Sequence, residues 1–560
     1  MEHWDWVALA ILLALAWLFP RAGDALFRRV ESSFSRLSAR RSASLALLFF
    51  GTILFRLALL PWLPVPVPGV HDEFSNLLAA DTFAHGRLTN PPHPLWMSFE
   101  SFHINVLPTY SSMYPPAQGL VLALGQLLGH PWIGVLLSCA AMCAAIAWML
   151  QAWLPARWAL LGGLIAFLKF AIVSYWINSY FGGALAALGG ALVLGSLPRI
   201  FRSHQTRHAL LLALGIALLA NSRPFEGLAL CLPVAAAFLW WLARSPSPSF
   251  SVKFRAVLLP LASLLLLTAG FIAYYNWRTT GDPLLMPHAL NRRAHPGTVF
   301  LWQPVRPHAH YNNPQFDGFY NGWELQTRFQ GTWPDFLRIL DEKYSTYSNV
   351  YLWKGSFLLF LFLPPLFTSR RWRFLVLVLA SSFLSLLVVA WFLPHYAAPA
   401  VCVLYALLLQ CLRHARTLRF AGRPVGVGLS RMLILLLLLT STAPLFGPIK
   451  QFSPSGWWNH QLGNQARATI AERLNIMPGR QLVIVHYEKF HNIHLEWVYN
   501  AADIDGSKIV WARELDTQQN QKLLAYFHDR RAWLLRVADD SSELTPYPPP
   551  QATPSATPNP

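Results

Sequence analysis

The sequence is dominated by apolar runs of about 20 residues, separated by short stretches that hold most of the arginines. An α-helix needs about that many apolar residues to cross a bilayer. Hydrophobic residues make up 54% of the chain and charged residues only 12%, which leaves too little polar surface to cover a soluble fold of this length. We therefore expect a mainly α protein, a polytopic transmembrane helical bundle with about ten spans.

The expected spans follow from the length of each apolar run. The first run, Trp6 to Pro20, has acidic residues before it and arginines after it, the reverse of a signal peptide, and is interpreted as a short span or an interfacial helix. Residues 116–129 are too short to cross and are expected in the interface. The remaining spans are expected at about 44–63, 132–153, 156–175, 179–198, 207–223, 225–243, 255–275, 351–368, 373–393, 396–412 and 431–449.

Basic residues gather between the apolar runs. A net charge of +18 would suggest nucleic acid in a soluble protein, but this arrangement is typical of the positive-inside tendency and of contact with anionic membrane lipids, so no nucleic-acid partner is expected. If the basic clusters are cytoplasmic, the loops at about 64–116 and 276–350 and the C-terminal domain lie outside the cytoplasm. The clusters are Arg36/Arg40/Arg41, Arg199/Arg202/Arg207, Arg244/Lys253/Arg255, Arg370/Arg371/Arg373 and Arg413/Arg416/Arg419/Arg423.

Composition divides the chain into four parts. Residues 1–43 hold the N-terminal short span and a basic amphipathic segment, and residues 44–450 form the transmembrane domain. Residues 451–545 have a soluble composition, with strands expected at 481–487, 508–512 and 532–537 and a helix at 517–528, which predicts a small α/β domain. Residues 546–560 are rich in proline, threonine and alanine and are expected to be disordered.

An acidic pair follows the span at 44–63. Asp72 and Glu73 begin a stretch, 73–87, whose apolar residues recur with helical spacing, so Asp72 is expected at or near a helix N-terminus, where the helix dipole stabilises a carboxylate. One interpretation is an ordinary N-cap, and the other is a functional carboxylate held at the membrane edge. The loop also contains His71, His85, His93, His103, Tyr110 and Tyr114.

Three motifs occur in a fixed order. The first is the Asp72-Glu73 exit with an alanine-rich helix that ends at His85-Gly86 and a Tyr114-Pro115-Pro116 entry to the next apolar run. The second is Asn221-Ser222-Arg223-Pro224-Phe225-Glu226-Gly227, and the third is His395-Tyr396-Ala397-Ala398-Pro399. Together they resemble the GT-C superfamily, and are most similar to its bacterial branch near the protein mannosyltransferases (glycosyltransferase family 39) and the aminoarabinose and galacturonic-acid transferases of lipid A. The resemblance covers about residues 44 to 450.

The resemblance implies a glycosyltransferase of the bacterial inner membrane. Such an enzyme transfers a hexosyl or pentosyl group from a polyprenyl-phosphate carrier to a lipid, glycan or protein acceptor on the extracytoplasmic face. By the match, Asp72 would be the general base for the acceptor, and Glu73 would orient Asp72 or the acceptor. Acceptor contact or positioning would fall to His71, Tyr114, Glu226 and Tyr396.

The donor carries a phosphate anion, and its site requires cations at the outer membrane edge. Residues 291–295, Asn-Arg-Arg-Ala-His, place two arginines in an outside loop against the positive-inside tendency, which favours an anionic ligand there. Position 395 holds histidine where the family usually has arginine, so this residue can be neutral. The candidate phosphate ligands are Arg223, His288, Arg292, Arg293 and His395.

Several points stay open. The turn at 175–180 lacks the second acid that many relatives carry, so catalysis would rest on the Asp72-Glu73 pair. No cofactor or metal is predicted, although a divalent cation is possible. The spacing of His491, His494 and Glu496 is compatible with zinc, but packing or acceptor contact is the preferred interpretation. The alternatives to an enzyme are a lipid or polysaccharide transporter, whose usual related halves are not seen, and an inactive scaffold.

Two basic residues fall inside expected spans. Arg56 and Lys169 both lie near a span end, and the preferred interpretation is that they extend toward the interface.

Overall fold

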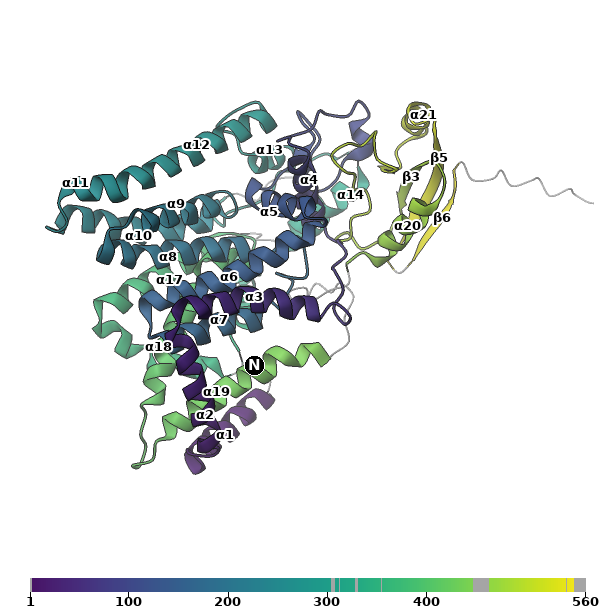
Figure 1. The fold of residues 1–560 in the computed structure, drawn as a ribbon. Helices are drawn as coiled ribbons and strands as arrows, with labels where there is room; N and C mark the ends of the chain where they lie inside the picture. The colour runs from purple at the N-terminus through teal and green to yellow at the C-terminus, as the bar shows by residue number, and fades with distance from the viewer. Residues whose placement is uncertain are drawn as a thin grey trace, which may run out of the picture.

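The structure, a computed structural model, describes residues 3–303, 308–311, 313–327, 331–353, 355–446, 463–539 and 541–547. A bundle of apolar helices makes up most of it, with a small α/β domain at one end (Figure 1). Within these ranges, eight helical segments are long and apolar enough to cross a membrane: Arg41–Ala58 (α3), Pro131–Trp153 (α6), Ala184–Ser203 (α8), Pro224–Arg244 (α10), Phe250–Thr280 (α11, η2 and α12), Arg370–Val388 (α17), Pro394–Arg416 (η6 and α18) and Val425–Thr442 (α19). The expected fold class, a mainly α transmembrane bundle with a small C-terminal α/β part, is confirmed.

Three of the expected spans differ from the helices that form. The runs at 156–175 and 207–223 give shorter helices, Ala156–Phe170 (α7) and Thr206–Ala220 (α9). The expected span at 351–368 is wrong: that segment forms two short 3₁₀ helices, Ser356–Phe362 (η4) and Pro364–Thr368 (η5). Consecutive prolines at 364 and 365 lack the amide hydrogens that a continuous α-helix requires.

The N-terminal segments and residues 116–129 form helices of their own. Helix α1 (His3–Leu18) packs against α19, and the basic amphipathic stretch is α2 (Asp24–Ala39). Residues Pro116–Leu127 form α5, whose 12 residues are too few to span a bilayer, as expected.

The centre of the bundle is formed by α6, α8 and α18, whose alanine, leucine and glycine side chains are buried against one another. Small residues let these helices approach closely. At Gly190 in α8 a Cβ atom would lie 1.9 Å from the carbonyl oxygen of Pro399, so only glycine allows η6 (Pro394–Ala400) to lie against α8. This contact fixes the segment that carries His395 and Tyr396.

Arg56 does not extend to the interface, and that interpretation is wrong. Its side chain is fully buried, donates to the carbonyl oxygens of Leu63 (2.8 Å) and Pro64 (3.2 Å), and donates to Oδ1 of Asn178 at 2.9 Å. A buried guanidinium is tolerated because these acceptors replace water. Arg56 thereby ties the exit of α3 to the turn before α8.

Lys169 also donates to backbone carbonyls. Its Nζ atom lies 2.9 Å from the oxygen of Leu352.

The two long loops are largely ordered by short helices and packed aromatic side chains. The first contains α4 (His71–Ala84), η1 (Trp96–Phe99) and a two-stranded ribbon of β1 (Ile104–Asn105) and β2 (Ser111–Ser112). The second contains α13 (Pro287–Ala294), α14 (Pro314–Phe316), η3 (Asp317–Glu324), α15 (Leu325–Thr327) and α16 (Trp333–Tyr351). In Figure 1 the α4, α5, α13 and α14 segments lie between the bundle and the C-terminal domain.

The C-terminal domain is a four-stranded sheet with the order β4-β3-β5-β6. Strands β3 (Arg480–Tyr487), β4 (Ile509–Arg513) and β5 (Arg530–Val537) are parallel, and β6 (Ser542–Pro546) is antiparallel to β5. Helices α20 (Gln465–Ile476) and α21 (Thr517–Tyr526) connect to it. The three strands and the helix expected at 517–528 are found, whereas α20 and β6 were not expected. Residues 451–462 and most of the expected disordered tail lie outside the described residues.

The bundle has two chemically different ends. Helices α8, α10 and α18 each begin beside the long loops and end in arginines, at Arg202, Arg244 and Arg416 respectively. Helix α17 begins with arginines and ends beside the loops. The basic clusters therefore gather at the end opposite the C-terminal domain, and the three GT-C-like motifs lie at the other end.

Candidate active site

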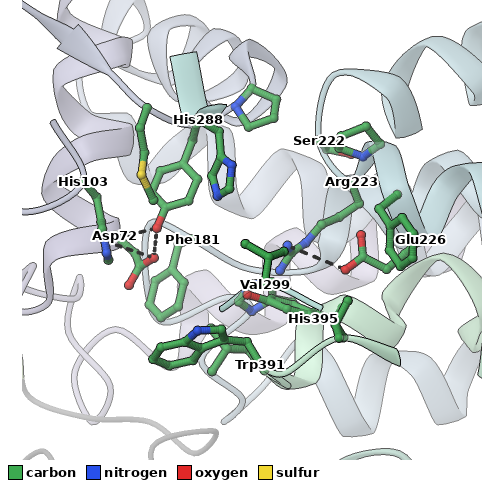
Figure 2. A pocket seen from close by; sticks show the side chains of 18 of the residues that line it. Asp72, His103, Phe181, Ser222, Arg223, Glu226, His288, Val299, Trp391 and His395 are labelled. Carbon is green, nitrogen blue, oxygen red and sulfur yellow. Dashed lines mark hydrogen bonds and ion pairs between the residues drawn. The ribbon is translucent and has the colours of Figure 1, made fainter. Parts of the chain in front are cut away.

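A cavity of about 1080 Å³ lies where the bundle meets the two loops. Its wall is built from α4, residues 113–118, the start of α8, the α9–α10 turn, α13, α16 and residues 389–396. Apolar side chains of α8, α12 and α13 contribute to the lining, and Figure 2 shows charged side chains directed into the cavity from both sides. The three sequence motifs, separated by hundreds of residues, each contribute to this one wall.

Asp72 lies on one side of the cavity, in the first turn of α4. Its Oδ1 atom accepts a hydrogen bond from the hydroxyl of Tyr114 and lies 3.7 Å from Nδ1 of His103. Its Oδ2 atom has no hydrogen-bond partner in the part of the chain that the structure describes. Figure 2 shows Asp72 beside His103, with its carboxylate directed into the cavity. The N-cap of α4 is Val70, so the interpretation of Asp72 as an N-cap is wrong.

His103 and Tyr114 hold the Asp72 carboxylate. Because the Tyr114 proton is directed at Asp72, the 3.1 Å contact between the Tyr114 oxygen and Nδ1 of His103 has the imidazole N–H as donor. Burial, followed by the charge of Arg292, holds the pKa of His103 well below its usual value, so this ring is neutral near pH 7.

His103 has a φ of 61°, which is uncommon for a residue other than glycine. Its carbonyl oxygen accepts bonds from Ser75 Oγ (2.6 Å) and from the amide of Met113 (3.1 Å). These bonds hold the backbone in a conformation that directs the ring at Tyr114.

Glu73 does not line the cavity. Its carboxylate lies behind α4, where it accepts the amide hydrogens of Gly69 (2.7 Å), Val70 (3.2 Å) and Tyr180 (3.2 Å). It thus caps α4 and ties this helix to the turn before α8. Burial raises the pKa of Glu73 to about 7. Glu73 is therefore placed to hold the helix that carries Asp72, and not to contact an acceptor in the cavity.

His71, by contrast, does line the cavity. Its Nε2 atom lies 2.8 Å from the carbonyl oxygen of Ile493, and its ring stacks on Phe102 with centroids 4.5 Å apart. Burial lowers the pKa of His71 to about 4. The neutral ring therefore links α4 to the C-terminal domain.

Arg223 lies on the side opposite Asp72 (Figure 2). Its guanidinium carbon sits 3.7 Å from the ring centre of Tyr396, and its Nη1 atom lies 3.9 Å from the carboxylate of Glu226. The planar guanidinium is thus held by an aromatic face and a partly separated acid, with donors left for a further anion.

The α13 helix supplies the remaining cations of the loop. Arg292 pairs with Glu324, with 2.9 Å between Nη1 and Oε1, and both side chains are largely buried. Burial and the charges of Arg292 and Arg223 lower the pKa of His288 to about 4. Arg293 lies on the cavity wall but is exposed. An anion placed between these groups would relieve their mutual repulsion.

His395 takes its orientation from the turn before α8. The Tyr175 hydroxyl lies 2.9 Å from Nδ1 of His395 and accepts the backbone amide of the same residue at 3.1 Å. These two contacts fix the orientation of the imidazole ring. The turn that lacks a second acid supplies this tyrosine instead.

Sequence reasoning missed Trp391, Trp323 and Lys343 in the wall. Trp391 and Trp323 line the cavity with ring centroids 5.3 Å apart, and His494, for which packing or acceptor contact was expected, lines it 4.5 Å from Trp323. Lys343 from α16 also lines it and donates to the carbonyl oxygens of Leu386 and Val389. No spacing in the sequence relates these residues, because each comes from a different segment.

The C-terminal domain is joined to the first loop by buried polar contacts. Glu496 and Arg513 form an ion pair of 3.0 Å, each with 1% of its side chain exposed, and Ser101 donates to the same carboxylate. Burial would raise the pKa of Glu496, but Arg513 holds it below its usual value. His491, His494 and Glu496 do not converge, and the described residues contain no group of three or more His, Cys, Asp or Glu side chains that would hold a metal ion.

Comparison with known proteins gives structural similarity only. No protein-family model and no curated protein matches the chain. The chain is similar to ArnT from Cupriavidus metallidurans in the apo state, with 14% identity over 88% of this chain and 92% of that one and a TM-score of 0.46. The same protein bound to undecaprenyl phosphate gives 13% identity, the same coverage and a TM-score of 0.45. The oligosaccharyltransferase from Archaeoglobus fulgidus tethered to an acceptor peptide gives 11% identity over 88% of this chain and 68% of that one, with a TM-score of 0.41. All three similarities are to solved structures of low sequence identity.

Proposed function

We propose that the protein is a membrane glycosyltransferase that moves a sugar from a polyprenyl-phosphate donor to an acceptor hydroxyl or amine. The observation that carries the proposal is a carboxylate with one unpaired oxygen, that of Asp72, which faces a cation-bearing wall across a cavity at the end of a transmembrane bundle. A general base and an anion site across one cavity are the two groups that this transfer requires.

The donor phosphate is proposed to bind at the cationic side. Arg223 has donors free for a bidentate contact, and His288, Arg292, Arg293 and His395 add charge or hydrogen bonds around it. The apolar wall beside α8 and α12 suits the first isoprene units of the carrier. Trp391 lies between the cations and Asp72, where the sugar ring would sit (Figure 2).

The transfer is a substitution at the anomeric carbon. The acceptor oxygen or nitrogen forms a bond to that carbon and gives its proton to Oδ2 of Asp72. The bond between the carbon and the phosphate oxygen breaks, and the polyprenyl phosphate leaves with the electron pair. Its additional negative charge is stabilised by the cationic wall. Glu73 and His71 are positioning residues, Tyr114 orients Asp72, and the pair of Glu226 and Tyr396 orients Arg223.

We further propose that the cavity faces the extracytoplasmic side of a bacterial inner membrane. The basic clusters lie at the other end of the same helices, and such clusters favour the cytoplasm. A single cysteine introduced at Asp505 would then react with a membrane-impermeant thiol reagent in intact spheroplasts. Labelling only after lysis would contradict this orientation. A lipid, glycan or protein acceptor fits the chemistry equally well, and no metal is assigned a role.

The test of the function is Asp72→Asn, assayed with a panel of radiolabelled polyprenyl-phosphate hexoses and pentoses in membranes. General-base catalysis is worth about 100- to 10,000-fold in rate, so transfer should fall by at least about 100-fold while the amount of inserted protein is unchanged. Asp282→Asn, in an exposed part of the second loop, is the matched control and should transfer normally. Normal transfer by Asp72→Asn would refute the assignment of the base. Movement of the lipid without a new glycosidic bond would indicate a transporter.

A further inference from the structure

A second charged feature lies at the end of the bundle opposite the cavity. Arginines from four helices gather there, where α6 and α8 end and α3, α7 and α17 begin: α3, α7, α8 and α17 supply them. None forms an ion pair with an acidic side chain in the described ranges. They are Arg41, Arg157, Arg199, Arg202 and Arg371, with Arg413 of α18 beside them.

Two of these arginines are bonded to the same atom. The carbonyl oxygen of Ala152, in the last turn of α6, accepts Nη2 of Arg371 at 2.6 Å and Nη2 of Arg202 at 3.3 Å. The two guanidinium nitrogens are therefore no more than about 6 Å apart, a distance at which like charges repel appreciably even at a protein surface. Arg413 is a further charged neighbour of Arg371.

The positions of these guanidinium groups are fixed by tryptophans. Arg371 lies over the ring of Trp153 at 5.0 Å, and Arg199 lies over Trp148 at 4.0 Å while it donates to the carbonyl oxygens of Gly195 and Trp148. Arg202 and Arg371 each donate one hydrogen bond to the carbonyl oxygen of Ala152, so most of the five N–H donors of each guanidinium stay available. The arginine side chains are thus held in place while several of their N–H groups stay available for an anion.

The same end of the protein shows how the chain neutralises arginines elsewhere. Arg416 pairs with Glu31 at 2.7 Å, and Arg431 pairs with Asp24 and with Glu31, the acids being supplied by α2. No acid of the described chain is placed against the pair of Arg202 and Arg371. A negative charge from outside the described chain would neutralise this pair.

We propose that Arg202 and Arg371, assisted by Arg199, bind the phosphate of an anionic phospholipid at this end of the bundle. Two forked guanidinium groups no more than about 6 Å apart match one phosphodiester that accepts from both. The level is that of the lipid headgroups, because the cluster sits at the termini of spanning helices. The acyl chains lie on the outer face of α17, where Leu377 and Leu384 are 58% and 61% exposed. This site is independent of the proposed transfer reaction.

The experiment compares the purified full chain in vesicles of phosphatidylcholine with the full chain in an equimolar mixture of phosphatidylcholine and phosphatidylglycerol. The thermal midpoint of unfolding of the unmodified chain should rise in the anionic mixture, and native mass spectrometry should show retained phosphatidylglycerol. The double variant Arg202→Gln, Arg371→Gln should lose most of the rise and the retained lipid. The matched control is Arg207→Gln, Arg255→Gln, which removes two exposed arginines from the same end and should keep both.

Two more arms separate the possible sources of the effect. The double variant Arg202→Lys, Arg371→Lys keeps the charge but loses the fork geometry; it should also retain less lipid, and if the glutamine variant does not fold this variant carries the test. Equal losses in the glutamine variant and its control, or full retention by the lysine variant, would show diffuse attraction and overturn the site. A rise of the midpoint with inorganic phosphate in detergent as large as that with phosphatidylglycerol would identify a soluble anion instead of a lipid.

Discussion

Removal of one hydroxyl, in Tyr114→Phe, isolates the contact that orients the proposed base. The Tyr114 hydroxyl donates to Oδ1 of Asp72 and accepts from Nδ1 of His103. The phenylalanine ring fills the same space, so the change deletes these two bonds and leaves the packing of the loop intact. Asp72 would keep its charge but lose the group that directs Oδ2 toward the acceptor.

The size of the effect follows from the strength of that bond. A hydrogen bond to a charged group is worth about 1.5–3 kcal/mol, and each 1.36 kcal/mol corresponds to a factor of ten in rate. If this contact is felt in the transition state, kcat should fall roughly 10- to 100-fold, less than for Asp72→Asn. The unpaired Nδ1–H of His103 should also lower the stability of the folded protein by about 1–3 kcal/mol. The KM for the lipid donor should be unchanged, because the cationic wall is untouched.

The assay is initial-rate transfer of a radiolabelled sugar from the donor that supports turnover, with kcat and KM measured separately for donor and acceptor. Tyr180→Phe is the matched control: this tyrosine is also buried, and its hydroxyl donates to the carbonyl oxygen of Pro66 at 2.8 Å, away from the cavity. An unchanged kcat for Tyr114→Phe would refute the reasoning. So would an equal loss in Tyr180→Phe, since that result would mark a general sensitivity of the loop.

Three other predictions follow from the same geometry. Because the pKa of Glu73 is raised to about 7, the folded state binds a proton between pH 4.5 and 7 that the unfolded state has lost. The free energy of unfolding should therefore fall by roughly 3 kcal/mol as pH rises through that range. Glu73→Gln should lose this pH dependence in thermal melts followed by tryptophan fluorescence. Glu496→Ala leaves the buried Arg513 without its acidic partner, which should lower the free energy of unfolding by about 3–5 kcal/mol and increase hydrogen exchange in residues 488–500. Glu543→Ala, on the exposed edge of the domain, should change neither. Arg223→Lys keeps the charge but loses the planar contact with the Tyr396 ring, so KM for the donor should rise at least about tenfold with a smaller change in kcat; an unchanged KM would remove Arg223 from the phosphate site.

The C-terminal domain holds the helix that carries Asp72. His71 of α4 is bonded to the carbonyl oxygen of Ile493, and Asp81 of the same helix accepts the amide of Ala502 at 2.7 Å. Helix α4 is thus held from two points by one domain. A substitution that weakens docking is therefore expected to move Asp72 as well, and its effect on activity should be read beside the exchange data.

Composition and periodicity were enough to predict the membrane bundle, the small α/β domain and the helix that carries Asp72. Spans of about 20 apolar residues and short apolar strands are local properties, which a short stretch of sequence reveals. The predicted span at 351–368 was wrong because hydropathy ignores the two prolines, and this segment forms short 3₁₀ helices instead. Ten of the eleven candidate site residues line the cavity, Glu73 being the exception.

Only the tertiary structure decided what each of these residues faces. Asp72 and Glu73 are neighbours in sequence, yet successive residues of a helix point about 100° apart, so one reaches the cavity and the other reaches the amides behind α4. Arg56, inside an apolar run, is held by carbonyl oxygens that follow it and by Asn178, 122 positions later. Tyr175, Trp391 and His494 join the site through contacts between segments that no periodicity relates. Pairings of this kind depend on how helices and domains pack, and packing is fixed by the whole chain at once.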